Sequence, residues 1–465
     1  MKNITILLIT LLTIVSVTAQ DITGKWNGVL KVQGTQLRLV FNVDKTDAGF
    51  SATMDSPDQG ANGIPVTTTS FENDSINFEV ANLLLKYTGE LKDNEIIGTF
   101  SQGGQVFPMN LSRNEIEKVV LKRPQEPKKP YPYYSEEVTF QNTKENISLS
   151  GTLTLPKKEG VYPVVILISG SGPQNRDEEL LGHKPFLVLA DHLTKNGIGV
   201  LRYDDRGTGE STGNFSTATS ADFATDVESA IAYLKTRKEV HKNKIGLVGH
   251  SEGGLIAPMV ASTSKDVDFI VLLAGPGISG GEILLLQQEL IARASGTSET
   301  DITKTYNLNK TVFDLIVASN SDEKLQEEIK TLLNRALEED MSNEIPNGMS
   351  QDEFVSLQIK QILNPWMQFF IKHDPAPVLE KVKCPVLAVN GEKDLQVPPK
   401  ENLSAIKNAL VKGGNKKVTT IEFPNLNHLF QTSDTGNPAE YGTIEETFSP
   451  IALKAVTDWI KKQVT

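Results

Sequence analysis

The chain has 465 residues and a formal net charge of −12. Its length exceeds one ordinary domain, and its glycine, proline and apolar fractions are those of a globular protein with a large core. An acidic surface attracts neither nucleic acid nor an anionic membrane, so the composition argues against both as partners. The single cysteine, Cys384, excludes a disulfide within the chain, and its apolar surroundings predict a buried, inert thiol.

Residues 1–19 have the pattern of a secretory signal peptide. Lys2 gives a positive start, the apolar run from Ile4 to Val17 is short for a membrane span, and the small Ala19 precedes a polar residue. We expect cleavage after Ala19 and a secreted or periplasmic mature protein without a membrane span. The alternative is an uncleaved anchor.

Residues 20–115 predict an antiparallel β-domain, either a small barrel or a sandwich. The short alternating segments, separated by Gly, Asn and Asp, are residues 26–32, 37–43, 50–54, 76–80, 84–91 and 96–100. A structural or dimer-forming role is favoured for this domain over a carbohydrate or lipid site. Four prolines among lysines and tyrosines then predict a stiff exposed linker over residues 116–135.

The segment 245–257 predicts a strand, a tight turn and a helix. The turn has the sequence Gly-His-Ser-Glu-Gly over residues 249–253. Small residues two before and two after Ser251 let strand and helix pass closely, and the strained turn exposes the hydroxyl near the helix N-terminus. A glycine-rich turn without chemistry is the alternative, but partner residues occur downstream. We therefore interpret Ser251 as a nucleophile.

A serine nucleophile needs a base, and the base needs a carboxylate that fixes its tautomer. Asp394 follows the apolar run 384–389, and we take it as the acid, with Glu392 as its local rival. His428 follows the alternating run 418–423, and we take it as the base. Of the six histidines, only His428 lies in a loop after a late strand. We expect the side chain of His250, beside the nucleophile, to point to the opposite side of the turn.

Together these motifs resemble the α/β-hydrolase superfamily, in which the triad follows in the order Ser, Asp, His. The resemblance runs from about residue 136 to the end with one interruption. It is carried by the elbow, by the acid loop 391–398, by Asn427-His428 and by the glycine-rich segment 204–211, which we interpret as a structural turn. It implies a mostly parallel, doubly wound sheet and a secreted bacterial-type carboxylesterase or serine aminopeptidase-like hydrolase. No cofactor or metal is expected, because the histidines lack paired ligand spacing and no nucleotide-binding loop occurs.

The resemblance also implies an oxyanion hole with two backbone donors. The amide after the nucleophile is that of Glu252, and the amide of Ser171 follows the strand 164–168. Here the chain departs from many relatives, which carry His-Gly where this chain has Ser169-Gly170. At the mouth of the site, Gln174 and Arg176 are candidates for substrate contact or members of a salt-linked surface loop.

Residues 278–373 interrupt the core segments 136–277 and 374–465 and place apolar residues at helical spacing. The predicted helices span residues 283–294, 310–318, 325–337 and 354–370. The family uses such an insertion as a cap over the site. Trp366 and Phe369 are therefore candidates for an acyl pocket, although most apolar residues of the segment are expected to form its own core.

These patterns predict a secreted serine hydrolase that cleaves small carboxylic acyl esters through an acyl-enzyme. A cap-type serine aminopeptidase is the alternative, since the acidic residues 338–340 are available for a substrate ammonium group. A non-enzymatic binding or assembly protein on an inactive hydrolase scaffold is a third interpretation. The sequence leaves the natural substrate and the oligomeric state open, a homo-oligomer included.

Overall fold

The computed structural model describes residues 21–32, 35–47, 49–59, 61–83, 85–102, 105–117, 122–319, 321–341, 345 and 350–465. The predicted signal peptide and its cleavage after Ala19 lie outside these residues and stay a prediction. The chain forms two compact units that divide at about residue 118. In the described stretches, no helix is both long and apolar enough to cross a membrane.

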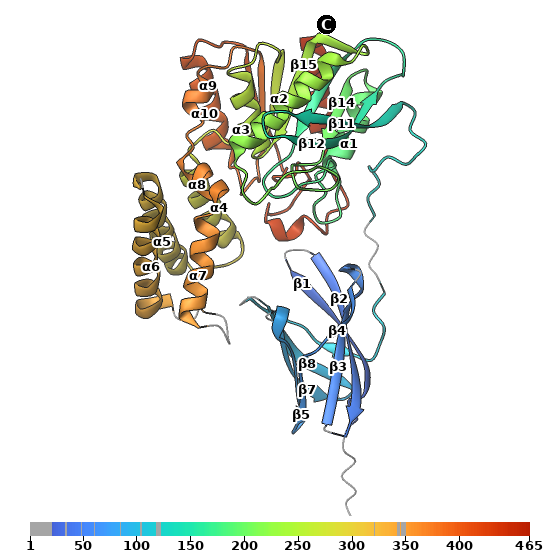
Figure 1. Cartoon of the computed structure of the whole chain (residues 1–465), viewed down its shortest axis with the longest axis vertical. Coiled ribbons are helices and arrows are strands. Elements are labelled where there is room, and N and C mark those ends of the chain that lie inside the picture. Colours follow the sequence, from blue (N-terminus) through green and yellow to red (C-terminus); the bar gives the residue numbers. More distant parts are fainter. Residues whose placement is uncertain are drawn as a thin grey trace, which may run out of the picture. The chain divides into compact units, whose positions relative to one another are not determined.

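The N-terminal unit is one antiparallel sheet that curls back on itself (Figure 1). Its strands are β1 (Gly24–Val32), β2 (Thr35–Thr46), β3 (Gly49–Ser56), β4 (Ala61–Pro65), β5 (Thr68–Glu72), β6 (Ser75–Val80), β7 (Leu85–Lys92), β8 (Glu95–Gln102), β9 (Gln105–Pro108) and β10 (Leu111–Ser112). The outermost strands β4 and β5 follow each other in the chain. The two residues between them bond to both neighbouring strands. The Val66 amide donates to the Ala52 carbonyl of β3 at 3.1 Å, and the Thr67 amide donates to the Glu79 carbonyl of β6 at 2.6 Å.

Alternating side chains of this sheet fill the enclosed space with a core of its own. Trp26, Phe41, Phe78 and Tyr87 are fully buried there, and the rings of Phe41 and Phe78 stack with centroids 4.4 Å apart. The predicted antiparallel β-domain is therefore present, as a single curled sheet rather than two packed sheets.

The second unit is built on a mixed sheet of eight strands. In spatial order they are β11 (Tyr134–Asn142), β12 (Ile147–Leu155), β14 (Gly199–Tyr203), β13 (Tyr162–Ile168), β15 (Val240–His250), β16 (Phe269–Leu273), β17 (Val386–Gly391) and β18 (Val418–Phe423). The pairs β11–β12 and β12–β14 are antiparallel, and the other pairs are parallel. The central strands are nearly continuous apolar runs because helices cover both faces.

Each face of the sheet has its own apolar cluster. The helices α2 (Ser220–Thr236), α3 (Gly253–Ala261) and α10 (Pro399–Lys412) contribute to one cluster. The helices α1 (Pro185–Lys195) and α11 (Pro450–Val464) contribute to the other. Parallel strands place their carboxyl ends at one edge of the sheet, so the loops after β13, β15, β17 and β18 meet there.

Between β16 and β17 the chain forms a group of helices with a separate apolar core (Figure 1). They are α4 (Gly280–Ala294), α5 (Glu299–Ala318), α6 (Asp322–Ala336), α7 (Gln351–Ile362) and α8 (Pro365–Lys372). The single helix predicted over residues 354–370 is wrong. Pro365 has no amide hydrogen to continue α7, and the Asn364 side chain begins α8 by accepting from the Met367 amide at 2.8 Å.

The segment predicted as a stiff exposed linker is partly packed onto the second unit. The Arg123 guanidinium donates to the carbonyls of Gly182, Gly442 and Ile444 at 3.1, 2.9 and 2.7 Å. The Gln125 side chain donates to the Phe448 carbonyl at 2.6 Å. The predicted stiffness stays a prediction. The predicted exposure is wrong where Arg123 and Gln125 bond to carbonyls of the second unit.

Candidate active site

Ser251 lies at the sharp turn between β15 and α3. Its φ of 52° is in the left-handed region, which a non-glycine residue occupies only under strain. The two flanking glycines are sterically required: a Cβ at Gly249 would lie 1.9 Å from the Gly253 carbonyl oxygen, and one at Gly253 would lie 2.1 Å from the oxygen of Ile168. The local geometry is that of a nucleophile elbow.

Asp394 and His428 meet at the ends of β17 and β18. Asp394 Oδ2 lies 2.8 Å from Nδ1 of His428, and both residues are buried. Asp394 Oδ1 accepts from the amides of Gln396 and Val397 at 2.9 and 2.8 Å, which fixes the carboxylate. The rival Glu392 instead accepts from the Asn425 amide at 2.9 Å. The structure therefore pairs His428 with Asp394.

The base lies beside the elbow. The ring of His250, the residue before Ser251, has its centroid 4.9 Å from that of His428. The His250 ring is buried against the histidine loop, where its Nε2 lies 3.0 Å from the His428 carbonyl oxygen. With Nδ1 of His428 engaged by Asp394, Nε2 is the nitrogen that can take a proton from a hydroxyl.

A polar cluster behind His428 holds the histidine loop in shape. Asn427 Oδ1 accepts from the amides of Leu429 and Gln431 at 3.0 and 2.9 Å. The Gln431 side-chain nitrogen lies 3.0 Å from Nε2 of His183, whose Nδ1 lies 2.9 Å from Thr447 Oγ1. His183 is fully buried, and burial lowers the pKa of its imidazole to about 4.

The pKa of His183 predicts a defined acid sensitivity. Its ordinary pKa is 6.5, so between about pH 6.5 and 4 the unfolded chain binds a proton that the folded chain does not, and stability falls as the pH falls. The full loss is about 3 kcal/mol. Urea unfolding at pH 7 and pH 4.5 should show a loss about 2 kcal/mol smaller in His183→Asn than in the wild type. Equal losses in both proteins would contradict this assignment.

The amides of both expected oxyanion donors are available to a ligand. In the part of the chain that the structure describes, the amides of Glu252 and Ser171 donate to no protein acceptor. The loop that carries Ser171 lies against the elbow, because a Cβ on Gly170 would lie 3.2 Å from Cβ of Ser251. Two such donors are what an oxyanion requires.

The Glu252 side chain has a separate structural role that the sequence did not reveal. It is buried, and its Oε1 accepts from Ser220 Oγ at 2.5 Å and from the Trp366 indole nitrogen at 2.7 Å. Burial raises the pKa of the Glu252 carboxyl. Trp366 of α8 is therefore bound to the residue that follows the nucleophile.

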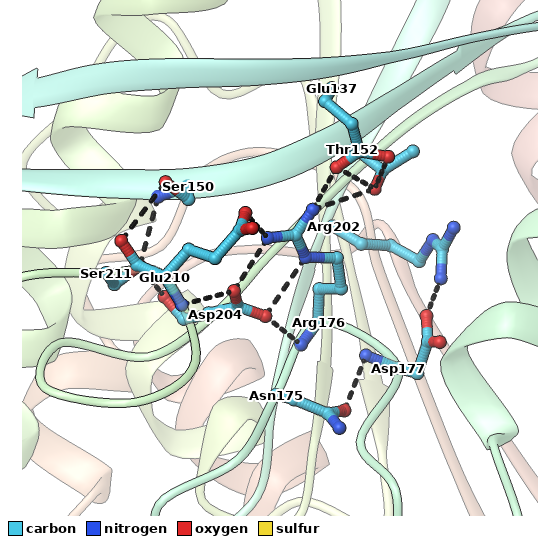
Figure 2. A network of polar contacts seen from close by, with 10 residues as sticks. All are labelled: Glu137, Ser150, Thr152, Asn175, Arg176, Asp177, Arg202, Asp204, Glu210 and Ser211. Atoms are coloured by element: carbon cyan, nitrogen blue, oxygen red, sulfur yellow. Dashed lines mark hydrogen bonds and ion pairs between the residues drawn. The ribbon is translucent and has the colours of Figure 1, made fainter.

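Arg176 is held in a dense ion-pair network rather than presented to a ligand (Figure 2). Its guanidinium donates to Asp204 Oδ2 at 2.7 Å and to Glu210 at 3.0 Å, and it also pairs with Glu137. Figure 2 shows these carboxylates surrounding the guanidinium, next to the pair of Arg202 with Asp177. Of the two interpretations of Arg176, the salt-linked loop fits this arrangement and substrate contact does not.

The remaining candidates for substrate contact lie in different settings. The Gln174 side chain donates to the Ser171 carbonyl at 3.3 Å and its amide to Asp205 at 3.0 Å, so it braces the loop of the expected oxyanion donor. Phe369 stacks on His373 with centroids 5.5 Å apart and belongs to neither of the clusters that include Trp366. Only Trp366 among the apolar candidates is bonded to the elbow.

No group of histidine, cysteine and acidic side chains within the described ranges has the arrangement of a metal site. The groups that the structure brings to this edge of the sheet include Ser251, His428 and Asp394 and the amides of Glu252 and Ser171. This set can perform nucleophilic acyl transfer.

Comparison with known proteins agrees with this chemistry. Residues 184–331 match the family described as serine aminopeptidase, S33. The chain is 28% identical to Esterase EstD of Thermotoga maritima over 315 residues, which cover 67% of this chain and 65% of that protein. The chain therefore spans slightly less than two thirds of this relative's length.

Two further similarities are weaker. A putative carboxymethylenebutenolidase of Synechocystis is 28% identical over 182 residues, or 38% of this chain and 68% of that protein. The structure of the Pyrococcus furiosus esterase Pf2001 is similar at 17% identity with a TM-score of 0.42, over 71% of this chain and 93% of that one.

Proposed function

We propose that this chain, which belongs to the α/β-hydrolase superfamily, is a serine hydrolase that cleaves carboxylic acyl esters through an acyl-enzyme on Ser251. One observation carries the proposal: the 2.8 Å pair of Asp394 and His428 lies against His250, the residue before a serine whose φ of 52° marks a nucleophile elbow. The 28% identity to an esterase over 315 residues supports it. No cofactor is needed for this reaction.

The proposed reaction uses each group in turn. Ser251 Oγ attacks the acyl carbonyl carbon as its proton passes to Nε2 of His428. The imidazolium is stabilised by Asp394, and the amides of Glu252 and Ser171 donate to the oxyanion. His428 then gives the proton to the alcohol oxygen as the C–O bond breaks, and water repeats the sequence to release the acid.

We further propose that the helices α4 to α8 form a cap that contributes the acyl pocket. Trp366 reaches the elbow through Glu252, and the residues Leu255, Ile283, Phe370 and Val397 form an apolar cluster that joins α3, α4, α8 and the acid loop. An apolar wall beside the nucleophile suits an acyl chain better than a charged group.

Removing the Trp366 ring should change chain-length preference. In Trp366→Ala the lost volume should raise kcat/KM for long-chain relative to short-chain nitrophenyl esters by about tenfold. The ratio of the two kcat/KM values does not depend on how much of the variant is folded, because both esters are measured with the same protein. Phe369→Ala is the matched control, since its ring stacks on His373, and it should leave the ratio unchanged. A shift in the control but not in Trp366→Ala would place the pocket elsewhere.

A serine aminopeptidase is the second candidate, because it is the description of the matching family model. The acidic segment offered for it has Glu338 and Glu339 exposed, and Glu339 is paired with Arg335 at 2.8 Å. These carboxylates have no bond to the elbow, which favours the ester. A panel of nitrophenyl esters against aminoacyl nitroanilides tests the choice: preferential ester cleavage supports the proposal, and preferential anilide cleavage overturns it.

A further inference from the structure

His250, the residue before the nucleophile, bonds through both ring nitrogens although it belongs to no triad. Its Nδ1 lies 2.9 Å from Glu178 Oε1, and its Nε2 lies 3.0 Å from the His428 carbonyl oxygen. Both His250 and Glu178 are buried, with 6% and 4% of their surface exposed. A buried polar pair of this kind costs desolvation and is retained only where its bonds are satisfied.

The proton positions follow from the partners. A carbonyl oxygen can only accept, so Nε2 of His250 must donate to His428. The remaining nitrogen faces the carboxyl group of Glu178. Burial alone disfavours the imidazolium, but the Glu178 carboxylate outweighs burial and raises the pKa of His250. An imidazolium that donates from both nitrogens satisfies both contacts.

Glu178 extends this contact to a third segment. The same Oε1 accepts from the Gly170 amide at 2.7 Å, one residue before the expected oxyanion donor Ser171. Gly170 is close to both partners, since a Cβ there would lie 3.2 Å from Ser251 Cβ and 3.3 Å from Glu178 Oε1. One carboxylate oxygen of Glu178 therefore contacts both the oxyanion loop and His250. His250 in turn contacts the histidine loop through its Nε2.

We propose that Glu178 and His250 are positioning residues that hold the His428 loop and the Ser171 loop in register on either side of Ser251. The proposal rests on the proposed function and adds two residues to its machinery that touch no substrate. It assigns a role to the elbow histidine that the triad leaves unused.

The two bonds of His250 require a carboxylate, and not merely a polar group, at position 178. A neutral His250 has one ring proton and cannot donate to both a side-chain oxygen and the His428 carbonyl. In Glu178→Gln, the uncharged amide cannot stabilise an imidazolium at His250. One Glu178 oxygen contacts both Gly170 and His250, and an amide oxygen or nitrogen in its place loses at least one of the bonds to Gly170, His250 and His428. A displacement of about 1 Å at a reacting group can cost about 10²-fold in rate.

The test compares Glu178→Gln and His250→Gln with wild type in nitrophenyl ester hydrolysis. We expect kcat to fall about 10²-fold in Glu178→Gln while KM changes less than about threefold, because orientation and not binding is lost. His250→Gln keeps one donor toward His428 and should lose less. Glu179→Gln, the exposed neighbour, is the matched control and should retain wild-type kinetics.

A pH profile separates positioning from a merely structural role. The charged groups facing His250 are Glu178 on one side and His428 with Asp394 on the other. Glu178→Gln removes the carboxylate that favours a protonated His250, so less positive charge lies against the His428 ring. The acid limb of kcat/KM should therefore move to higher pH. In the double variant the losses should not add, because the residues act as a pair.

Each outcome decides one claim. Wild-type kcat and an unshifted acid limb in folded Glu178→Gln overturn the positioning role while leaving the proposed hydrolase intact. If Glu178→Gln does not fold, His250→Gln carries the test with the same readouts, and wild-type values there overturn it equally. A wild-type protein that neither hydrolyses esters nor reacts with a fluorophosphonate refutes the proposed function and the positioning role with it.

Discussion

Ser251→Ala is expected to reduce ester turnover by about 10⁴ to 10⁶ in kcat, to the limit of detection. The hydroxyl is the only group at the elbow that can form the acyl-enzyme, and alanine keeps the Cβ that the turn already accommodates at a φ of 52°. The fold should therefore persist, as thermal unfolding would show. Nitrophenyl acetate hydrolysis by the purified variant is the measurement.

The control for this variant is Ser216→Ala, at an exposed serine outside the site. It should keep wild-type turnover. Retention of wild-type activity in Ser251→Ala would show that the elbow does not supply the nucleophile, whatever the backbone strain there.

Asp394→Asn is expected to lose about 10⁴ in kcat. An asparagine amide facing Nδ1 of His428 donates where the carboxylate accepts, so the imidazole proton moves to Nε2 and the base cannot take the serine proton. Glu392→Gln should stay within about tenfold, since Glu392 bonds the Asn425 amide and not the ring. Both variants are measured with the same ester across pH.

Asp394→Asn and Glu392→Gln can be compared directly, because each substitution removes one negative charge and leaves the shape of the side chain nearly unchanged. If Glu392→Gln loses several orders of magnitude and Asp394→Asn does not, the acid is Glu392 and the 2.8 Å pair is not the working one.

The sequence predicts the elbow well because its requirement is local. Gly249 and Gly253 are needed wherever a strand turns directly into a helix over a serine, since any Cβ there would overlap backbone atoms. Asp394 and His428 are predictable for a related reason: Asp394 follows an apolar run, His428 follows an alternating one, and the carboxyl ends of parallel strands meet at one edge.

Other features depend on tertiary contacts that local patterns do not encode. Arg176 and Glu178 lie in one charged loop, yet the first is taken up by surrounding carboxylates and the second is buried against His250. Two charged residues so close in the sequence give no signal for which of them is buried in the site. The side chain of Glu252 is a similar case, because its partners Ser220 and Trp366 are far away in the chain.

Errors in the predicted elements have physical causes as well. The apolar spacing over residues 354–370 continues through Pro365, so periodicity alone joined α7 and α8 into one helix. The predicted segments do not include the strands β4 and β5. Both are short and mix polar with apolar residues, and they form strands because they complete the curled sheet. The linker prediction counted prolines, while Arg123 and Gln125 determine where the segment lies.

Covalent trapping tests the central claim most directly. A fluorophosphonate should add once to the folded wild-type chain, and peptide mass mapping should place the adduct on Ser251, with labelling slowed by several orders of magnitude in Asp394→Asn. An adduct on another residue, or no adduct on a folded protein that still hydrolyses esters, would contradict the assignment of Ser251, His428 and Asp394 as the reacting groups.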